Sequence, residues 1–212
     1  MNKFFTTRRC RPLAAALSLM LLGACSALGP TSTPPPILYS LDRPSEVALP
    51  VTPTATRAAM LTLIINPPHA AAGFDSQRII YVREPHKLES YAHSLWVDPP
   101  ARMLAALLPG VIERSGAFRA VVLAPGAAAG DLRLDTEIVR LQHEFQSVPS
   151  RVRFTLRATL VDDKTRGVLA WREFEAVANA NSEDPYGGVV AANRAVQAVL
   201  EKLSLFLAER QQ

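Results

Sequence analysis

Cysteine and histidine are considered first in this 212-residue chain. The spacing of their thiol and imidazole groups decides which chemistry they could perform. Its two cysteines, Cys10 and Cys25, both lie near the N-terminus. A thiol can act as a nucleophile, bind a metal, form a disulfide or accept a lipid group. Leu22 and the two small residues Gly23 and Ala24 come directly before Cys25. This context favours cleavage between Ala24 and Cys25.

The residues before Cys25 have the composition of a secretion signal. Residues 1–12 hold four basic residues and no acid, and residues 13–22 are apolar except for Ser18. A basic segment, a short apolar run and small residues together mark a removable signal peptide. The apolar run is too short for a membrane-spanning helix, which needs roughly 20 apolar residues.

The four residues that end at Cys25 resemble the lipobox of bacterial lipoproteins. The resemblance implies a signal peptide over residues 1–24 and a Cys25 that carries S-diacylglycerol and an N-acyl chain such as palmitate. Two or three acyl chains make a durable membrane anchor, whereas one chain binds only marginally. Ser26, in place of an aspartate, implies transfer to the outer membrane, with the protein facing the periplasm.

Removal of the signal changes what the composition implies. The whole chain has 23 basic and 19 acidic residues, and the signal holds four of the basic ones, so the mature chain is balanced. A nucleic-acid-binding function, which a basic chain would suggest, is therefore not expected. Loss of Cys10 and acylation of Cys25 leave no thiol for a disulfide, a zinc site or a nucleophile.

The mature chain divides into a tether and a domain. Residues 25–59 are rich in proline, serine and threonine, which is typical of an extended linker. Within this tether a short edge strand is expected near residues 37–41, because strand-forming residues interrupt the prolines. Residues 60–212 have the usual size of one domain with one core.

Two helices are expected in this domain. Asp98 should cap the first helix, which runs to about residue 116, and Pro109 should kink it or end its first half. Asp184 and Pro185 should begin the second helix, whose apolar residues recur at spacings of three and four.

Strands fill the rest of the predicted domain, although the segment 87–96 has no clear pattern. The predicted fold class is α/β (α+β), a mixed and mostly antiparallel sheet with two helices packed on one face. The expected strands cover residues 60–65, 77–83, 118–123, 132–138, 152–160 and 168–177.

No catalytic or metal-binding motif is found. The sequence lacks a Gly-x-Ser-x-Gly elbow, a phosphate-binding glycine loop and a His-Glu-x-x-His helix. His86 and His93 would share a face on a helix, but their segment begins at Pro85 and does not read as one. The remaining histidines are His69 and His143. We therefore expect no catalytic residue, no metal and no cofactor other than the lipid.

One basic strand face has two interpretations. Arg151, Arg153 and Arg157 could bind an acidic partner or a lipid headgroup. They could instead form a solvated face in which Glu173 and Glu175 of the next strand are their cross-strand partners, and this interpretation is favoured.

Several segments together resemble the ABC-type transport auxiliary lipoprotein family, and their order along the chain is more specific than any one of them. They are the lipobox, the proline-rich tether, Tyr39-Ser40-Leu41, residues 73–83, Leu88, Tyr91, residues 96–104, residues 115–121 and the pair Ala192-Asn193.

The resemblance implies a non-enzymatic subunit with no catalytic residues. Its partners would be an MCE-domain (mammalian-cell-entry) protein and the associated ABC permease and ATPase, which move phospholipid or other lipids across the envelope. It implies a small α/β sandwich related to the N-terminal domain of the Tol-system β-propeller protein. Lipid binding by the domain, docking of a partner and a homo-oligomer all stay open. The alternatives are an outer-membrane assembly or plug lipoprotein and an envelope hydrolase.

Overall fold

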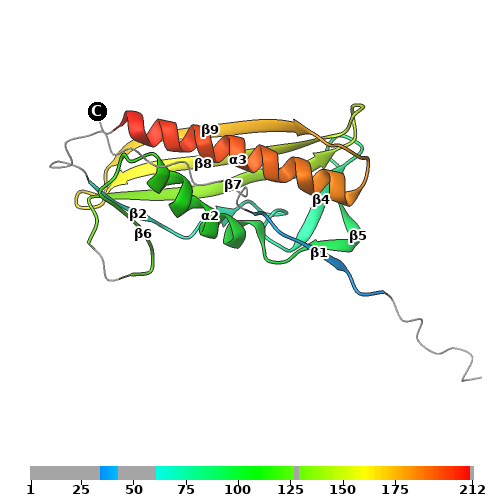
Figure 1. Ribbon diagram of the computed structural model, residues 1–212, viewed down its shortest axis with the longest axis horizontal. Coiled ribbons are helices and arrows are strands. Elements are labelled where there is room, and N and C mark those ends of the chain that lie inside the picture. Colours follow the sequence, from blue (N-terminus) through cyan, green and yellow to red (C-terminus); the bar gives the residue numbers. More distant parts are fainter. Residues whose placement is uncertain (1–33, 43–60, 127–128, 211–212) are drawn as a thin grey trace, which may run out of the picture. The chain divides into compact units, whose positions relative to one another are not determined.

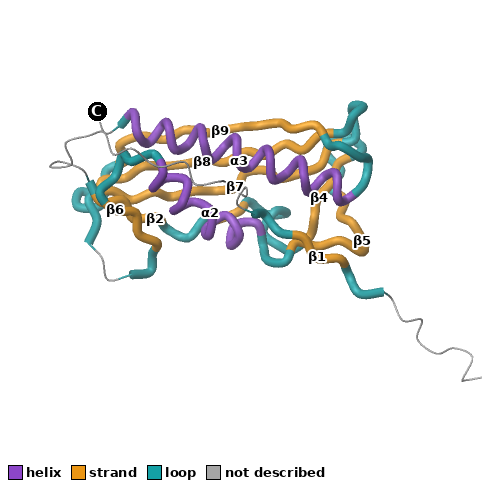
Figure 2. The backbone as a smooth tube through the Cα atoms, viewed as in Figure 1, coloured by secondary structure: helices purple, strands orange, loops and turns teal. Residues whose placement is uncertain are grey.

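The structure of the chain is a computed structural model that describes residues 34–42, 61–126 and 129–210. Ala24, Cys25 and the rest of the expected signal peptide lie outside the described residues. From Pro36 onward the described residues belong to one unit, in which two helices pack on a sheet (Figures 1 and 2). In these described ranges no helix combines the length and the apolar character needed to span a bilayer.

Strand β7 (Leu132–Glu144) is the central strand of the sheet. On one edge it pairs with β8 (Arg151–Asp162), and β8 pairs in turn with β9 (Val168–Asn179). Both pairings are antiparallel and extend over almost the full length of the strands. Residues 163–167 form the turn that joins β8 to β9.

The other edge of β7 is shared by three short strands, all parallel to it. β2 (Thr62–Ile65) pairs near its start, β3 (His69–Ala70) near its middle and β4 (Arg78–Val82) at its end. The far edge of β2 pairs with β6 (Ala120–Leu123), again in parallel. The sheet is therefore split, because β2 and β4 lead to different outer strands.

The branch that begins at β4 ends at the N-terminal strand. β4 pairs with β5 (Glu89–Trp96) in antiparallel fashion, and β5 pairs with β1 (Ile37–Tyr39) in parallel. β5 occupies the segment that had no clear sequence pattern. β1 is the short edge strand expected near residues 37–41.

The predicted fold class is confirmed: the sheet is mixed, and the long ladders β7–β8 and β8–β9 make antiparallel pairs the majority of paired residues. One difference concerns the length of β7, which was expected to end at Ile138. A bulge between Ile138 and Arg140 shifts the register. Before it the even-numbered side chains are buried, and after it Leu141 and His143 are buried instead. A bulge of this kind breaks the alternation from which strands are predicted.

Helix α3 (Pro185–Glu209) covers the long strands and supplies much of the core. It begins where it was expected, because the Asp184 carboxylate accepts the N–H of Gly187 at 2.7 Å. Its buried stripe includes Val199, Leu203 and Leu207, which pack with Phe154 and Leu156 of β8 in one core.

Helix α2 (Pro100–Arg114) differs from its prediction in two respects. Asp98 does not cap it, because its carboxylate instead pairs with Arg102 at 2.9 Å and the capping position is Pro99. Pro109 does not end it, and the helix continues for another turn. Apolar residues on both sides of the proline, Leu108 and Ile112 among them, are buried in the core, so packing holds both halves in place despite the lost hydrogen bond.

The first turn of α3 lies unusually close to the sheet. A Cβ atom on Gly188 would lie 2.5 Å from Nδ1 of His143 on β7, and one on Gly187 would lie still closer to the backbone of Ser182. Neither contact is tolerated between real atoms, so both positions require glycine. Gly188 therefore sets how closely the helix can approach the sheet, and Gly187 sets how closely its first turn lies to the preceding loop.

Gly188→Ala should destabilise the protein by about 1–3 kcal/mol, because α3 must move away from His143 or displace its ring. Gly126→Ala is the matched control, since a Cβ there meets its nearest neighbour at 3.4 Å. The control should change stability by less than about 0.5 kcal/mol. Urea unfolding of both variants measures the difference, and equal stability for the two would contradict the close approach.

Candidate functional site

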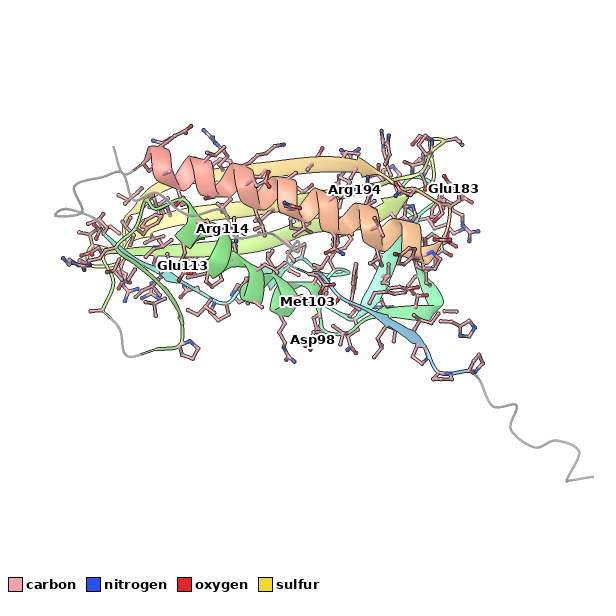
Figure 3. The ribbon with its side chains drawn as sticks, in the orientation of Figure 1. Asp98, Met103, Glu113, Arg114, Glu183 and Arg194 are labelled. Carbon is pink, nitrogen blue, oxygen red and sulfur yellow. The ribbon has the colours of Figure 1, made fainter. Side chains whose placement is uncertain are left out.

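The chain that arrives from the N-terminus is held by both helices at a point we call the tether clamp, formed by Ser40, Leu41, Asp42, Met103 and Asn193. The Asn193 side chain on α3 accepts the N–H of Asp42 at 2.8 Å and donates to the carbonyl of Ser40 at 3.2 Å. Between them the N–H of Leu41 points to the sulfur of Met103 on α2 at 3.4 Å, and the Leu41 side chain is buried. Met103 is labelled in Figure 3.

The clamp joins two segments that contribute separately to the family resemblance of the sequence. Tyr39-Ser40-Leu41 and Ala192-Asn193 are far apart in the chain, and the structure brings them together. The carbonyl of Tyr39 also accepts the N–H of Val97 at 2.7 Å, just beyond the end of β5. The clamp thus anchors the tether end to the sheet edge and to both helices.

A buried polar cluster lies under the start of α3. His143 Nε2 is 2.8 Å from the hydroxyl of Ser150, and Nδ1 is 3.0 Å from the hydroxyl of Tyr91. Glu183, labelled in Figure 3, accepts the backbone N–H of Ser150 at 2.8 Å. Burial lowers the pKa of His143, although the charges of Glu183 and Asp184 oppose this shift. Burial also raises the pKa of Tyr91, so the cluster is held uncharged at its centre.

This cluster contains the serine–histidine contact that a hydrolase would need, and the sequence search did not find it. The Ser150 side chain is fully buried and His143 is 2% exposed, so an external substrate does not reach the hydroxyl. The second nitrogen of His143 faces a tyrosine, whereas a catalytic triad places a carboxylate there. The arrangement links β5, β7 and the start of β8.

The other histidines are separated in space. His69 is on β3, His86 is in the turn between β4 and β5 with a positive φ, and His93 is an exposed residue of β5. Within the described ranges no group of three or more His, Cys, Asp or Glu side chains is arranged to hold a metal ion.

The arginines on the solvent face of β8 are paired, as the favoured interpretation predicted. Arg157 bonds Glu137 at 2.9 Å and Glu173 at 3.2 Å, and Arg153 bonds Glu175. These cross-strand pairs neutralise the positive charge with which the arginines would otherwise attract a headgroup or an acidic partner. The face is a solvated ladder of ion pairs whose exposed members each contribute little to stability.

Glu144 was not predicted as a member of this ladder, and it is the most buried of the acids there. It accepts hydrogen bonds from Arg151 at 3.0 Å, from Arg153 at 2.8 Å and from Gln142 at 2.9 Å. Burial alone would raise the pKa of Glu144, but the bonds from Arg153, Gln142 and Arg151 outweigh it and lower the pKa to about 2. The bulge in β7 hides this residue from sequence analysis, because it reverses which face Glu144 lies on.

A shallow groove follows the contact between α2 and α3. Its volume is about 360 Å³, part of it open to solvent, and it continues into an open hollow of about 830 Å³. Leu205, 66% exposed, lines the hollow, and Arg114 (Figure 3) lines both. The apolar residues lining the groove are Leu107, Val111, Val196 and Leu200.

Asn193→Ala should release the tether clamp, because the backbone of Ser40 and Asp42 loses both of its partners on α3. We expect a loss of about 1–2 kcal/mol in unfolding free energy and faster hydrogen exchange at the Asp42 amide. Gln197→Ala, one turn along the same helix, is the control, because its side-chain amide bonds only Glu201. An unchanged exchange rate at Asp42 would show that Asn193 does not hold the tether.

Glu144→Gln should remove a pH-dependent part of the stability. Glu144 binds its proton less readily in the folded chain than in the unfolded one, whose pKa is near 4.5, so its contribution is full above that value. It is lost as pH falls towards about 2 and amounts to about 3 kcal/mol. Urea unfolding should therefore show the stability gap between wild type and variant closing over this range. Glu137→Gln, in an exposed pair, should show no such change.

Comparison with known proteins gives this architecture a family. A family model described as the ABC-type transport auxiliary lipoprotein component matches residues 39–204. None of the curated proteins compared with this chain matches it.

A crystal structure of protein XCC0632 from Xanthomonas campestris is 24% identical, with a TM-score of 0.67 over 82% of this chain and 97% of that one. A crystal structure of an uncharacterized protein is 12% identical, with a TM-score of 0.60 over 84% and 99%. These structures share the fold, and the family model, which spans the clamp and both helices, shows that the chain belongs to the ABC-type transport auxiliary lipoprotein family.

Proposed function

We propose that this chain is a non-catalytic lipoprotein subunit of an ABC/MCE-type system that moves lipid across the cell envelope. In this proposal Cys25 carries the lipid anchor in the outer membrane, and the domain docks the MCE-domain protein from the periplasmic side. The family match carries the proposal, because it covers residues 39–204, most of the described domain, and names a transport auxiliary.

The tether clamp supports a role in positioning. In it side chains of α2 and α3 bind the backbone of Ser40, Leu41 and Asp42, directly after β1. Residues 26–36, between Cys25 and β1, span at most about 40 Å when fully extended. A domain held in this way stays within a fixed distance of its membrane, which suits a docking subunit.

Docking is better supported than lipid carriage by the domain itself. Ligand pockets usually enclose roughly 300–1,000 Å³ and bury most of the ligand. The α2–α3 groove offers only about 20 Å³ of comparable space, and Arg114 and Glu201 are on its lining. It offers a shallow surface for one acyl segment and no enclosed cavity for a whole phospholipid.

The test is co-purification of the full-length lipoprotein with the MCE-domain protein and its ABC permease and ATPase from detergent-extracted envelopes. We expect the wild type to carry the MCE protein with it and to hold less than one phospholipid per domain after gentle extraction. Cys25→Ala should leave the membrane fraction and lose its acyl chains by mass spectrometry, while its domain still binds purified MCE protein.

Two controls separate the alternatives. Ser26→Asp should keep the acyl chains and move the protein to the inner membrane, which tests the sorting step alone. A wild type that captures an outer-membrane β-barrel and no MCE protein would support the assembly or plug function and reject docking.

A further inference from the structure

Strand β9 is an edge of the sheet, since in the described part of the chain it pairs with β8 alone. One hydrogen bond just after the end of β9 shows which of its backbone groups face β8. The N–H of Ala180 donates to the carbonyl of Ser150. In an antiparallel ladder the bonded residues alternate. From Ala170 to Asn179 the even-numbered residues of β9 therefore bond β8, and odd-numbered ones such as Trp171 and Glu173 direct both N–H and C=O away from it. The register shift before Ala170 ends this alternation.

Among the described residues, side chains of α3 bond carbonyls only in the second half of this edge, although Phe206 of α3 also contacts Arg172 in the first half, with 4.6 Å between the ring centroid and the guanidinium carbon. The Lys202 ammonium donates to the carbonyl of Glu175 at 2.8 Å, and the Arg194 guanidinium, labelled in Figure 3, donates to the carbonyl of Asn179. Charged side chains placed on an edge strand prevent it from pairing with other chains. Among the described residues no side chain makes such a bond to the carbonyl of Trp171 or Glu173. We call the uncovered stretch Val168–Glu173 the open edge.

The open edge also carries most of the exposed apolar side chains of β9. Val168 is 62% exposed, Leu169 54% and Trp171 66%. Trp171 points to the solvent face of the sheet, opposite Thr159 of β8. Leu169 lies at the register shift between β8 and β9. Unpaired backbone groups and exposed apolar side chains thus coincide in one six-residue stretch.

We propose that the open edge receives an extended, apolar strand of the MCE-domain protein, which adds to the sheet beside β9. The proposal rests on the proposed function for the identity of the partner. A strand added to a sheet edge gains affinity from main-chain hydrogen bonds and specificity from alternate side chains. Trp171 supplies the kind of side chain that dominates binding energy at protein interfaces.

The size and charge of the patch favour a single strand over other occupants. Three exposed side chains offer on the order of a few hundred Å², whereas a stable contact between globular domains buries about 800 Å² on each partner. The basic residues of the neighbouring turn are already paired, Lys164 with Asp131 and Arg166 with Asp163. They therefore leave little charge with which to attract an anionic membrane surface.

The experiment measures binding of purified full-length lipoprotein to the purified MCE-domain protein. Trp171→Lys should weaken binding by about tenfold or more. Val177→Lys, an exposed residue on the same face of β9 in the covered half, should not. In the wild-type complex the amides of Trp171 and Glu173 should exchange about tenfold more slowly. The amides of Arg172 and Phe174, already bonded to β8, should not change.

Any other result rejects the inference, and one of them also rejects the proposed function. Absence of wild-type binding rejects the proposed function and this inference with it. Wild-type binding that is unaffected by Trp171→Lys, or that leaves the amides of Trp171 and Glu173 unchanged, rejects the inference alone. Protection of these amides that rises with lipoprotein concentration alone identifies a second copy as the occupant. Protection caused by phospholipid vesicles alone identifies a membrane, and either result overturns the inference.

Discussion

The backbone hydrogen bonds along β7 are the constraint from which the architecture follows. A buried N–H or C=O without a partner costs about 1–3 kcal/mol, so a strand this long in the middle of a sheet needs partners on both edges. β8 satisfies one edge over almost its whole length. The other edge is divided among β2, β3 and β4 in turn. These strands are short and follow one another along β7 in the same direction. The chain then returns through β5 and α2 to β6, which pairs in parallel with β2. The helices cover one face, and the ion pairs of β8 lie on the other.

Local patterns predicted the elements of this fold far better than the contacts between them. Alternation identified the first part of β7 and β8, and the Asp184 cap identified the start of α3, because each signal lies within a few neighbouring residues. The failures were places where packing or register overrides a local rule. Burial of Leu108 and Ile112 carries α2 past Pro109, and the bulge in β7 hides the last part of that strand.

The candidate site was predicted only in part, for the same reason. Glu173 and Glu175 were identified as partners of the arginines because cross-strand pairing follows from hairpin register. Glu144 was missed because its face depends on the bulge. The contact between His143 and Ser150 and the bonds from Asn193 to Ser40 and Asp42 join segments that are distant in sequence, and no spacing rule reports them. Gly187 and Gly188 are the one local signal at this junction, because glycine usually weakens a helix.

Two of the outer strands of the sheet, β1 and β9, are treated in opposite ways, and β6 is the outer strand of the remaining branch. At one edge β1 is the end of the tether, and Asn193 and Met103 fix the residues that follow it. At the opposite edge Lys202 and Arg194 of α3 bond carbonyls in the second half of β9, and none of the described side chains bonds the carbonyl of Trp171. The same helix therefore holds the incoming chain on one side of the sheet and limits the open edge on the other. Because the strand order places β1 and β9 at opposite edges, a pull on the tether acts on the edge of the sheet remote from β9. Tethering and partner binding at β9 can then occur together without competing for the same backbone groups.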